Sequence, residues 1–182
     1  MTLSRTELAK KIFQVAHLTG EFKLRSGKTS NQYFDKYRFE SQPELLANIA
    51  SQMASLIPAK IDALAGLELG GIPVATALSL QTKTPAVYVR KSAKEYGTCR
   101  VAEGFESLKG KKLCIVEDVV TTGGQILLSV EDLRGEGAIV DTVICVICRE
   151  EEAFAKLKEK GLTLLPLFTM ADLTAHRSDA LK

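Results

Sequence analysis

Residues 113–125 read LCIVEDVVTTGGQ, and this stretch decides what kind of sheet the chain builds. Four apolar residues lead into two adjacent acids, Glu117 and Asp118, and a turn of threonines and glycines follows after two valines. A buried carboxylate is unfavourable unless it is paired, so we expect the acids at the rim of a sheet and not in its middle. The stretch therefore predicts a buried strand that ends in a tight loop, from which a helix begins.

The same alternation of strands and helices extends to both sides of this stretch. Because the expected strands are continuously apolar, they predict an α/β fold with a parallel, doubly wound sheet that helices cover on both faces. The strands are expected at residues 61–68, 85–90, 111–118, 139–148 and 162–168, and the helices between them at residues 72–80, 123–137 and 150–161.

The N-terminal part of the chain departs from this alternation. A helix is expected at residues 4–17, where Ser4 and Glu7 have the spacing of a capping box, and another at residues 41–57, where Ser41 and Glu44 have it too. Residues 20–39 between them indicate a short hairpin or an irregular pair of strands. A chain of 182 residues suits a single domain, residues 1–182, with an N-terminal elaboration on the substrate side (about residues 1–40) and an α/β core (about residues 41–182).

Composition excludes several classes of protein. A net charge of +2 is too small to indicate nucleic-acid binding, and no apolar run approaches the ~18 residues that cross a membrane. The N-terminus has no apolar signal-peptide core, so a cytoplasmic location is expected. Cys145 and Cys148 form a C-x-x-C pair, but they lie in a β-branched strand and offer two ligands where structural zinc requires four. We therefore expect them to pack in the core.

Three strand ends carry residues suited to a phosphorylated ligand. Gly70 and Gly71 follow one strand and TTGGQ follows another, so both loops can present backbone N–H groups to an anion at the start of a helix. Glu117 and Asp118 can accept hydrogen bonds from sugar hydroxyls or approach a magnesium ion held by phosphates. No G-x-x-x-x-G-K-[ST] sequence is present, which argues against a P-loop nucleotidase.

The third strand end leads into a cationic segment, VYVRKSAKEYGTCR at residues 87–100. A solvated charge run is the usual interpretation of such a segment, but it also suits a mobile lid that closes over a polyphosphate leaving group. Two glycine cradles, an acid pair and a cationic loop together fit 5-phosphoribosyl 1-pyrophosphate (PRPP).

These segments resemble those of a known family. CIVEDVVTTGGQ (114–125) resembles the PRPP-binding motif of type I phosphoribosyltransferases, and VRKSAKEYG (89–97) resembles the catalytic loop of orotate phosphoribosyltransferases. FKLRSGKTSNQYFD (22–35) is similar to the substrate segment of that family, and AGLELGGIPVATALS (65–79) to its pyrophosphate loop. The resemblance implies the type I fold and transfer of a phosphoribosyl group from PRPP to orotate, which gives orotidine 5′-monophosphate and pyrophosphate in pyrimidine biosynthesis.

The resemblance also implies roles for individual residues. Lys94 and Asp118 are the expected catalytic residues. The expected PRPP-binding residues are Arg90, Lys91, Lys94 and Tyr96 in the loop, Glu117 and Asp118 at the ribose, and Val119, Val120, Thr121, Thr122, Gly123, Gly124 and Gln125 toward the 5′-phosphate. The expected orotate-binding residues are Arg25, Tyr33, Phe34, Thr121 and Arg149.

Cofactor and assembly follow from the same resemblance. Mg²⁺ is expected to be held mainly through the pyrophosphate and ribose of PRPP, with no direct protein ligand, and a homodimer is expected to share the loop at residues 90–97 across its subunits. The chain also departs from the family pattern, since Tyr96 replaces a histidine, and Gly124 and Gln125 replace small hydroxyl residues. Two alternatives thus stay open: a related transferase for another nucleobase, and a non-catalytic regulator that senses PRPP.

Overall fold

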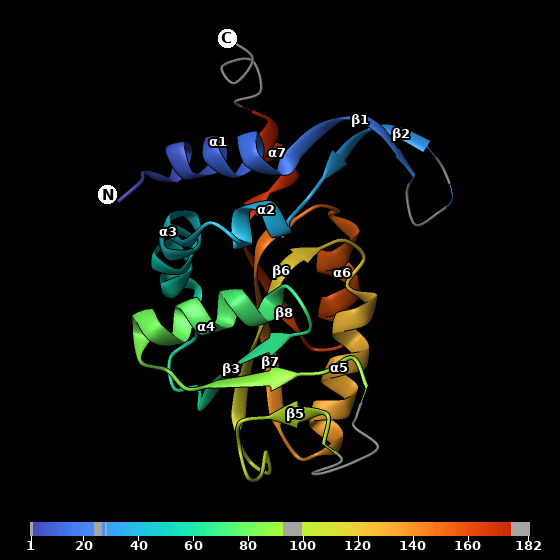
Figure 1. Cartoon of the computed structure of the whole chain (residues 1–182). Helices are drawn as coiled ribbons and strands as arrows, with labels where there is room; N and C mark the ends of the chain where they lie inside the picture. Colours follow the sequence, from blue (N-terminus) through green and yellow to red (C-terminus); the bar gives the residue numbers. More distant parts are fainter. Residues whose placement is uncertain (1, 24–26, 28, 93–99, 176–182) are drawn as a thin grey trace.

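The central sheet of the chain has six strands in the order β5-β4-β3-β6-β7-β8 (Figure 1). This computed structural model describes residues 2–23, 27, 29–92 and 100–175. Neighbouring strands are parallel except for the antiparallel pair β4 and β5. The prediction of a mostly parallel sheet is confirmed, but β5 was not among the expected strands. The strands are β3 (Ala63–Leu67), β4 (Ala86–Val89), β5 (Ala102–Glu103), β6 (Lys112–Val120), β7 (Ile139–Cys148) and β8 (Thr163–Thr169).

Helices cover both faces of this sheet, as the apolar strands predicted. In Figure 1, α3 and α4 lie on one face, and α5 and α6 lie on the other. Residues of β6 alternate between the two cores, with Ile115 packed in the cluster under α5 and α6 and Val116 packed in the cluster under α3 and α4. The helices are α3 (Pro43–Met53), which continues into the 3₁₀ turn Ala54–Leu56, α4 (Gly71–Thr82), α5 (Gly124–Gly135) and α6 (Glu152–Glu159).

The N-terminal segment forms a helix and a hairpin at one end of the sheet (Figure 1). It comprises α1 (Arg5–Ala16), the antiparallel strands β1 (His17–Lys23) and β2 (Thr29–Phe34), and the short helix α2 (Tyr37–Glu40). The expected capping box of α1 is confirmed, because the Glu7 amide donates to Ser4 Oγ and the Glu7 carboxylate accepts from the Ser4 amide. The N-terminal segment does not have a hydrophobic core of its own, since Ile12 and Phe39 are fully buried in the same cluster as Val116 of the sheet.

Two short helices and one helix start differ from the sequence prediction. Neither α2 nor α7 (Met170–Thr174) was expected. The capping box expected at Ser41 and Glu44 is wrong: α3 begins at Pro43 after Gln42, whose side chain makes no capping bond. Ser41 is already used by the preceding helix α2, where its hydroxyl donates to the carbonyl of Arg38. The capping-box spacing of Ser41 and Glu44 could not show that Ser41 belongs to the end of α2 and not to the start of α3.

The cysteine pair packs in the core as expected. Cys145 is fully buried in β7, Cys148 is nearly so, and neither forms a disulfide. Burial raises the pKa of the Cys145 thiol well above its ordinary value, which keeps this thiol neutral and unreactive. Within the described ranges, every helix is too short or too polar to cross a membrane.

Candidate active site

The end of strand β6 directs its two acids to opposite sides. Glu117 is half-buried, whereas Asp118 has no exposed surface. Both carboxylates fold back onto the backbone: the Asp118 amide donates to Glu117 Oε2 at 3.1 Å, and the Val119 amide donates to Asp118 Oδ1 at 2.5 Å. The sequence predicted that both acids would hold ribose hydroxyls, but their environments differ because successive strand residues point to opposite faces.

A pocket of about 240 Å³ lies on the Glu117 side of the strand. Gly123 adopts a left-handed conformation with φ of 73°, which turns the chain from β6 into α5, and no side chain caps the first turn of that helix. The free amide groups of this turn and the positive end of the helix dipole favour an anion. The pocket thus joins eight of the predicted PRPP residues with Ile126, and its lining is Glu117 and residues 119–126.

The electrostatics of the pocket are set by Glu117. Burial, together with the Asp118 carboxylate beside it, raises the pKa of Glu117 well above the ordinary carboxyl value. A carboxyl group held at a raised pKa can exchange a proton with a neighbouring hydroxyl more readily than an ordinary surface acid can. The predicted phosphate loop and one of the two predicted ribose acids are therefore together in one pocket.

Asp118 faces a different group of residues, which the sequence interpretation did not include. Its Oδ2 atom lies 2.6 Å from the ammonium nitrogen of Lys36, the residue that precedes α2. Glu40, at the end of α2, is also buried beside it, and both carboxyls lie against the backbone of Gly70. A weak signal was available, because Lys36 and Glu40 are four residues apart, the spacing that places two side chains on one face of a helix.

The segment that resembles a pyrophosphate loop lies at the start of α4. Gly71 packs directly on the carbonyl of Val116, so that this loop lies close against the end of β6. Glu68 Oε2 accepts a hydrogen bond of 3.1 Å from the amide of Lys91, which joins the ends of β3 and β4. Glu68 was not predicted as a site residue, although it lies in the segment that resembles a pyrophosphate loop.

Of the predicted loop residues, Arg90 and Lys91 are described by the structure. The Arg90 guanidinium lies 3.5 Å from the carboxylate of Glu103 in β5, and its amide donates to the carbonyl of Val101. Lys91 is exposed at the beginning of the loop. Lys94 and Tyr96 lie outside the described residues, so their roles stay predictions.

The predicted orotate residues are spread over two regions. Arg149 is exposed at the end of β7, and its amide donates to the carbonyl of Val120, one residue before Thr121. Tyr33 is exposed on the hairpin and stacks on Phe22, with 5.5 Å between ring centroids, whereas Phe34 packs against the core. Arg149 and Thr121 are thus neighbours, Tyr33 and Phe34 face different surroundings, and Arg25 lies outside the described residues.

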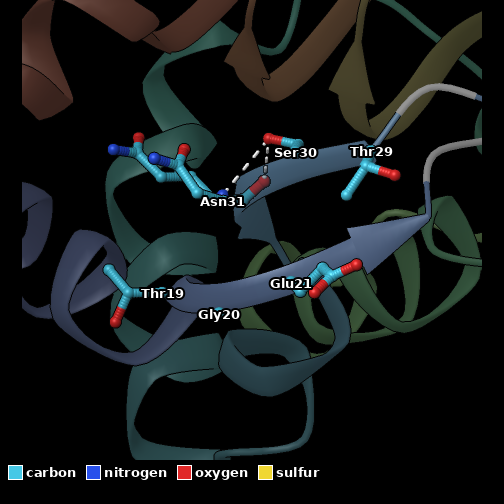
Figure 2. A pocket seen from close by; sticks show the side chains of 7 residues that line it. Thr19, Gly20, Glu21, Thr29, Ser30 and Asn31 are labelled. Carbon is cyan, nitrogen blue, oxygen red and sulfur yellow. Dashed lines mark hydrogen bonds between the residues drawn. The ribbon is translucent and has the colours of Figure 1, made fainter.

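The hairpin carries a second, larger hollow of about 550 Å³. Figure 2 shows its lining on β1 and β2, where Ser30 bonds to both the amide and the carbonyl of Gln32. The described lining comprises Thr19, Gly20, Glu21, Thr29, Ser30, Asn31 and Gln32, and Glu21 is the charged residue among these seven. Among the residues that the structure describes, none of the predicted site residues lines this hollow.

The amino-acid sequence of this chain is similar to those of proteins in one known family. Residues 38–163 match the family described as phosphoribosyl transferase domain. An orotate phosphoribosyltransferase of a Nocardioides species is 49% identical over 177 residues, which cover 97% of this chain and 98% of that protein. The orotate phosphoribosyltransferase of Thermococcus kodakarensis is 41% identical over the whole of both chains.

Solved structures that resemble this chain include proteins of the same kind. An orotate phosphoribosyltransferase of Mycobacterium tuberculosis in complex with Fe(III) dicitrate superimposes with a TM-score of 0.83 at 33% identity, over 93% of this chain and 98% of that one. The same enzyme in complex with PRPP has a TM-score of 0.78 at 30% identity, over 93% and 98% of the two chains.

Proposed function

Because the chain belongs to the orotate phosphoribosyltransferase family, we propose that it transfers the 5-phosphoribosyl group from PRPP to orotate, giving orotidine 5′-monophosphate and pyrophosphate. The observation that carries this proposal is the pocket in which Glu117 meets the loop at residues 119–126 and the uncapped start of α5. A carboxyl beside an anion-binding helix end suits a ribose with a 5′-phosphate.

Binding precedes chemistry in this proposal. The amide groups and threonine hydroxyls of residues 121–125 bind the 5′-phosphate, and Glu117 accepts a hydrogen bond from a ribose hydroxyl. Arg149, exposed beside the same loop, pairs with the carboxylate of orotate through its planar guanidinium. Together these contacts place the ring nitrogen of orotate against the anomeric carbon, which lowers the entropic barrier of the reaction.

The chemical step breaks the bond between the anomeric carbon and the pyrophosphate oxygen while the bond to the orotate nitrogen forms, and the proton of that nitrogen passes to the departing pyrophosphate or to solvent. Positive charge develops on the ribose and negative charge on the departing pyrophosphate. Cations positioned at that oxygen stabilise the transition state. We assign this role to Lys91 and Lys94 of the loop, with Arg90 at its base, and the roles of Lys94 and Tyr96 rest on the family resemblance alone.

Magnesium fits this site as an ion brought with the substrate. Mg²⁺ ordinarily takes one or two carboxylates together with substrate phosphates, and the Glu117 carboxyl lies in the pocket beside the uncapped start of α5. Glu117 would hold it indirectly through the ribose hydroxyls, whereas Lys36 covers the carboxylate of Asp118. When bound, the ion neutralises charge on the pyrophosphate.

Assembly and location belong to the same proposal. A homodimer that shares residues 90–97 between subunits, a division of the chain near residue 40 and a cytoplasmic location stay predictions from the sequence. Sedimentation equilibrium tests the dimer. Activity in mixtures of a Lys94 variant with an Arg149 variant tests the shared loop, because a hybrid dimer regains one intact site only if each site takes its loop from the other subunit.

The reaction itself is tested by mixing the protein with PRPP, Mg²⁺ and a panel of nucleobases. Orotate consumption is followed by ultraviolet absorbance, and consumption of another base in its place would overturn the assignment of orotate. Lys94→Ala should lower turnover by about 10²-fold or more while the circular dichroism spectrum is unchanged, because charge on the leaving group loses its cation. Lys158→Ala, at an exposed lysine in α6, is the matched control.

A further inference from the structure

Helix α2 brings two charged residues to the end of β6 that the proposed reaction does not yet use. The ammonium nitrogen of Lys36 lies 2.6 Å from Asp118 Oδ2, and the carboxyl of Glu40 lies one helical turn further along the same face. Lys36 also lies 5.2 Å from the ring centroid of Tyr37, which adds a cation–π contact to the ion pair. The chain therefore reaches from its N-terminal segment directly to an acid of the ribose site.

Gly70 explains how these acids can be packed so closely. A Cβ atom at this position would overlap Asp118 Oδ2 and would lie 2.9 Å from Glu40 Oε1, so only a residue without a side chain leaves room for both carboxyls. Position 70 consequently cannot present a cation of its own to Asp118. Among the described residues, Lys36 is the cation that forms an ion pair with it.

Lys36 is the solvent-accessible member of the group formed by Lys36, Glu40 and Asp118. Asp118 has no exposed surface and Glu40 is only 7% exposed, whereas the side chain of Lys36 is 32% exposed. Burial lowers the pKa of Lys36, but the attraction of Asp118 and its hydrogen bond outweigh burial, so the pKa is raised and the ammonium is charged at neutral pH. Lys36 thus covers the Asp118 carboxylate and presents positive charge to solvent.

We propose, on the basis of the function proposed above, that Lys36 is a further PRPP-binding residue, whose ammonium group is held in place by Asp118 and reaches the ligand from helix α2. An ammonium has three donors, and the ion pair with Asp118 uses one of them. No other described residue accepts from this ammonium group, so its remaining donors can reach a ribose hydroxyl or a phosphate oxygen next to Glu117. Glu40 and Gly70 act as positioning residues, since they fix the carboxylate on which Lys36 rests.

Isothermal titration calorimetry of PRPP with Mg²⁺ tests this proposal without requiring turnover. Lys36→Met should weaken PRPP binding about 10- to 100-fold, because hydrogen bonds from a charged donor are lost. Lys36→Arg should restore most of the affinity, and the control Lys158→Met should bind as the wild type does. In steady-state kinetics the KM for PRPP should rise with Lys36→Met, while the KM for orotate should change by less than about twofold.

Binding of PRPP by Lys36→Met with wild-type affinity would overturn the proposal. So would an equal loss of affinity in Lys36→Arg and Lys36→Met, because the charge would then be irrelevant. A wild-type chain that binds PRPP through Lys36 but leaves orotate untouched contradicts the proposed reaction and not this inference.

A second measurement applies if Lys36→Met fails to fold. Wild-type protein is methylated reductively with and without PRPP and Mg²⁺, and each lysine is quantified by mass spectrometry. Ligand should protect Lys36 and leave Lys158 unchanged. Equal modification of Lys36 in both samples would show that the ligand does not meet this ammonium group.

Discussion

The buried carboxyl of Glu40 makes a specific prediction about how stability depends on pH. Burial, together with the neighbouring Asp118 carboxylate, raises its pKa from the ordinary value of 4.5 to about 9. The folded chain therefore keeps a proton on Glu40 that the unfolded chain releases above pH 4.5. Folding binds this proton, so the contribution of Glu40 to stability is complete below pH 4.5 and is lost progressively as the pH rises toward 9.

The magnitude follows from the distance between the two pKa values. At pH 7 the unfolded carboxyl is about 2.5 pH units above its pKa, which corresponds to about 3 kcal/mol of lost stability. Screening by solvent reduces this to about 1–3 kcal/mol. Glu40→Gln keeps a neutral side chain of the same shape and has no proton to lose. The variant should therefore gain stability relative to the wild type as the pH rises, by up to about 1.4 kcal/mol per pH unit.

The assay is urea unfolding at a series of pH values between 5.5 and 8.5, at about one-unit spacing or finer. The chain has no tryptophan, so far-ultraviolet circular dichroism is the suitable signal. Glu131→Gln, at an exposed glutamate in α5, controls for the change of residue type itself. If the difference in unfolding free energy between Glu40→Gln and the wild type stays constant across this range, Glu40 is ionised in the folded chain and the reasoning is refuted.

Two further predictions concern single contacts of the site. Gly70→Ala should lower both the stability of the protein and its affinity for PRPP, because the added Cβ overlaps the Asp118 carboxylate. The control Gly135→Ala, at the end of α5, has open space around the new Cβ and should be neutral or stabilising by about 0.5–1 kcal/mol. Thermal unfolding measures the stability and calorimetry the PRPP affinity; wild-type values of both in Gly70→Ala would contradict the close packing of Gly70 on Asp118. Arg149→Leu should raise the KM for orotate about tenfold or more while the KM for PRPP changes little, because only orotate loses a charged hydrogen bond. Steady-state kinetics measures the two KM values, and an equal rise in both would show that Arg149 does not bind the base.

The sheet and its helices could be predicted from the sequence because they depend on local patterns. Continuous apolar runs, glycine-rich turns and the 3.6-residue period give the parallel strands and the helices between them, and the capping box of α1 is a local motif as well. The predicted phosphate loop is also local: residues 119–125 line one pocket because they are contiguous around a single turn. Where two elements compete for the same residues, as α2 and α3 do at Ser41, the pattern gave the wrong helix start.

The local pattern of residues was enough to predict the fold class and to place the predicted phosphate loop and the acid pair at the end of β6. The surroundings of each acid are set by contacts between distant elements. Glu117 lines the pocket, whereas Asp118 is sealed beneath Lys36 and against Gly70. The surroundings of Asp118 are formed by α2, the turn before α4 and the end of β6. Residues 36, 70 and 118 are far apart along the chain, and no periodicity in the sequence connects them.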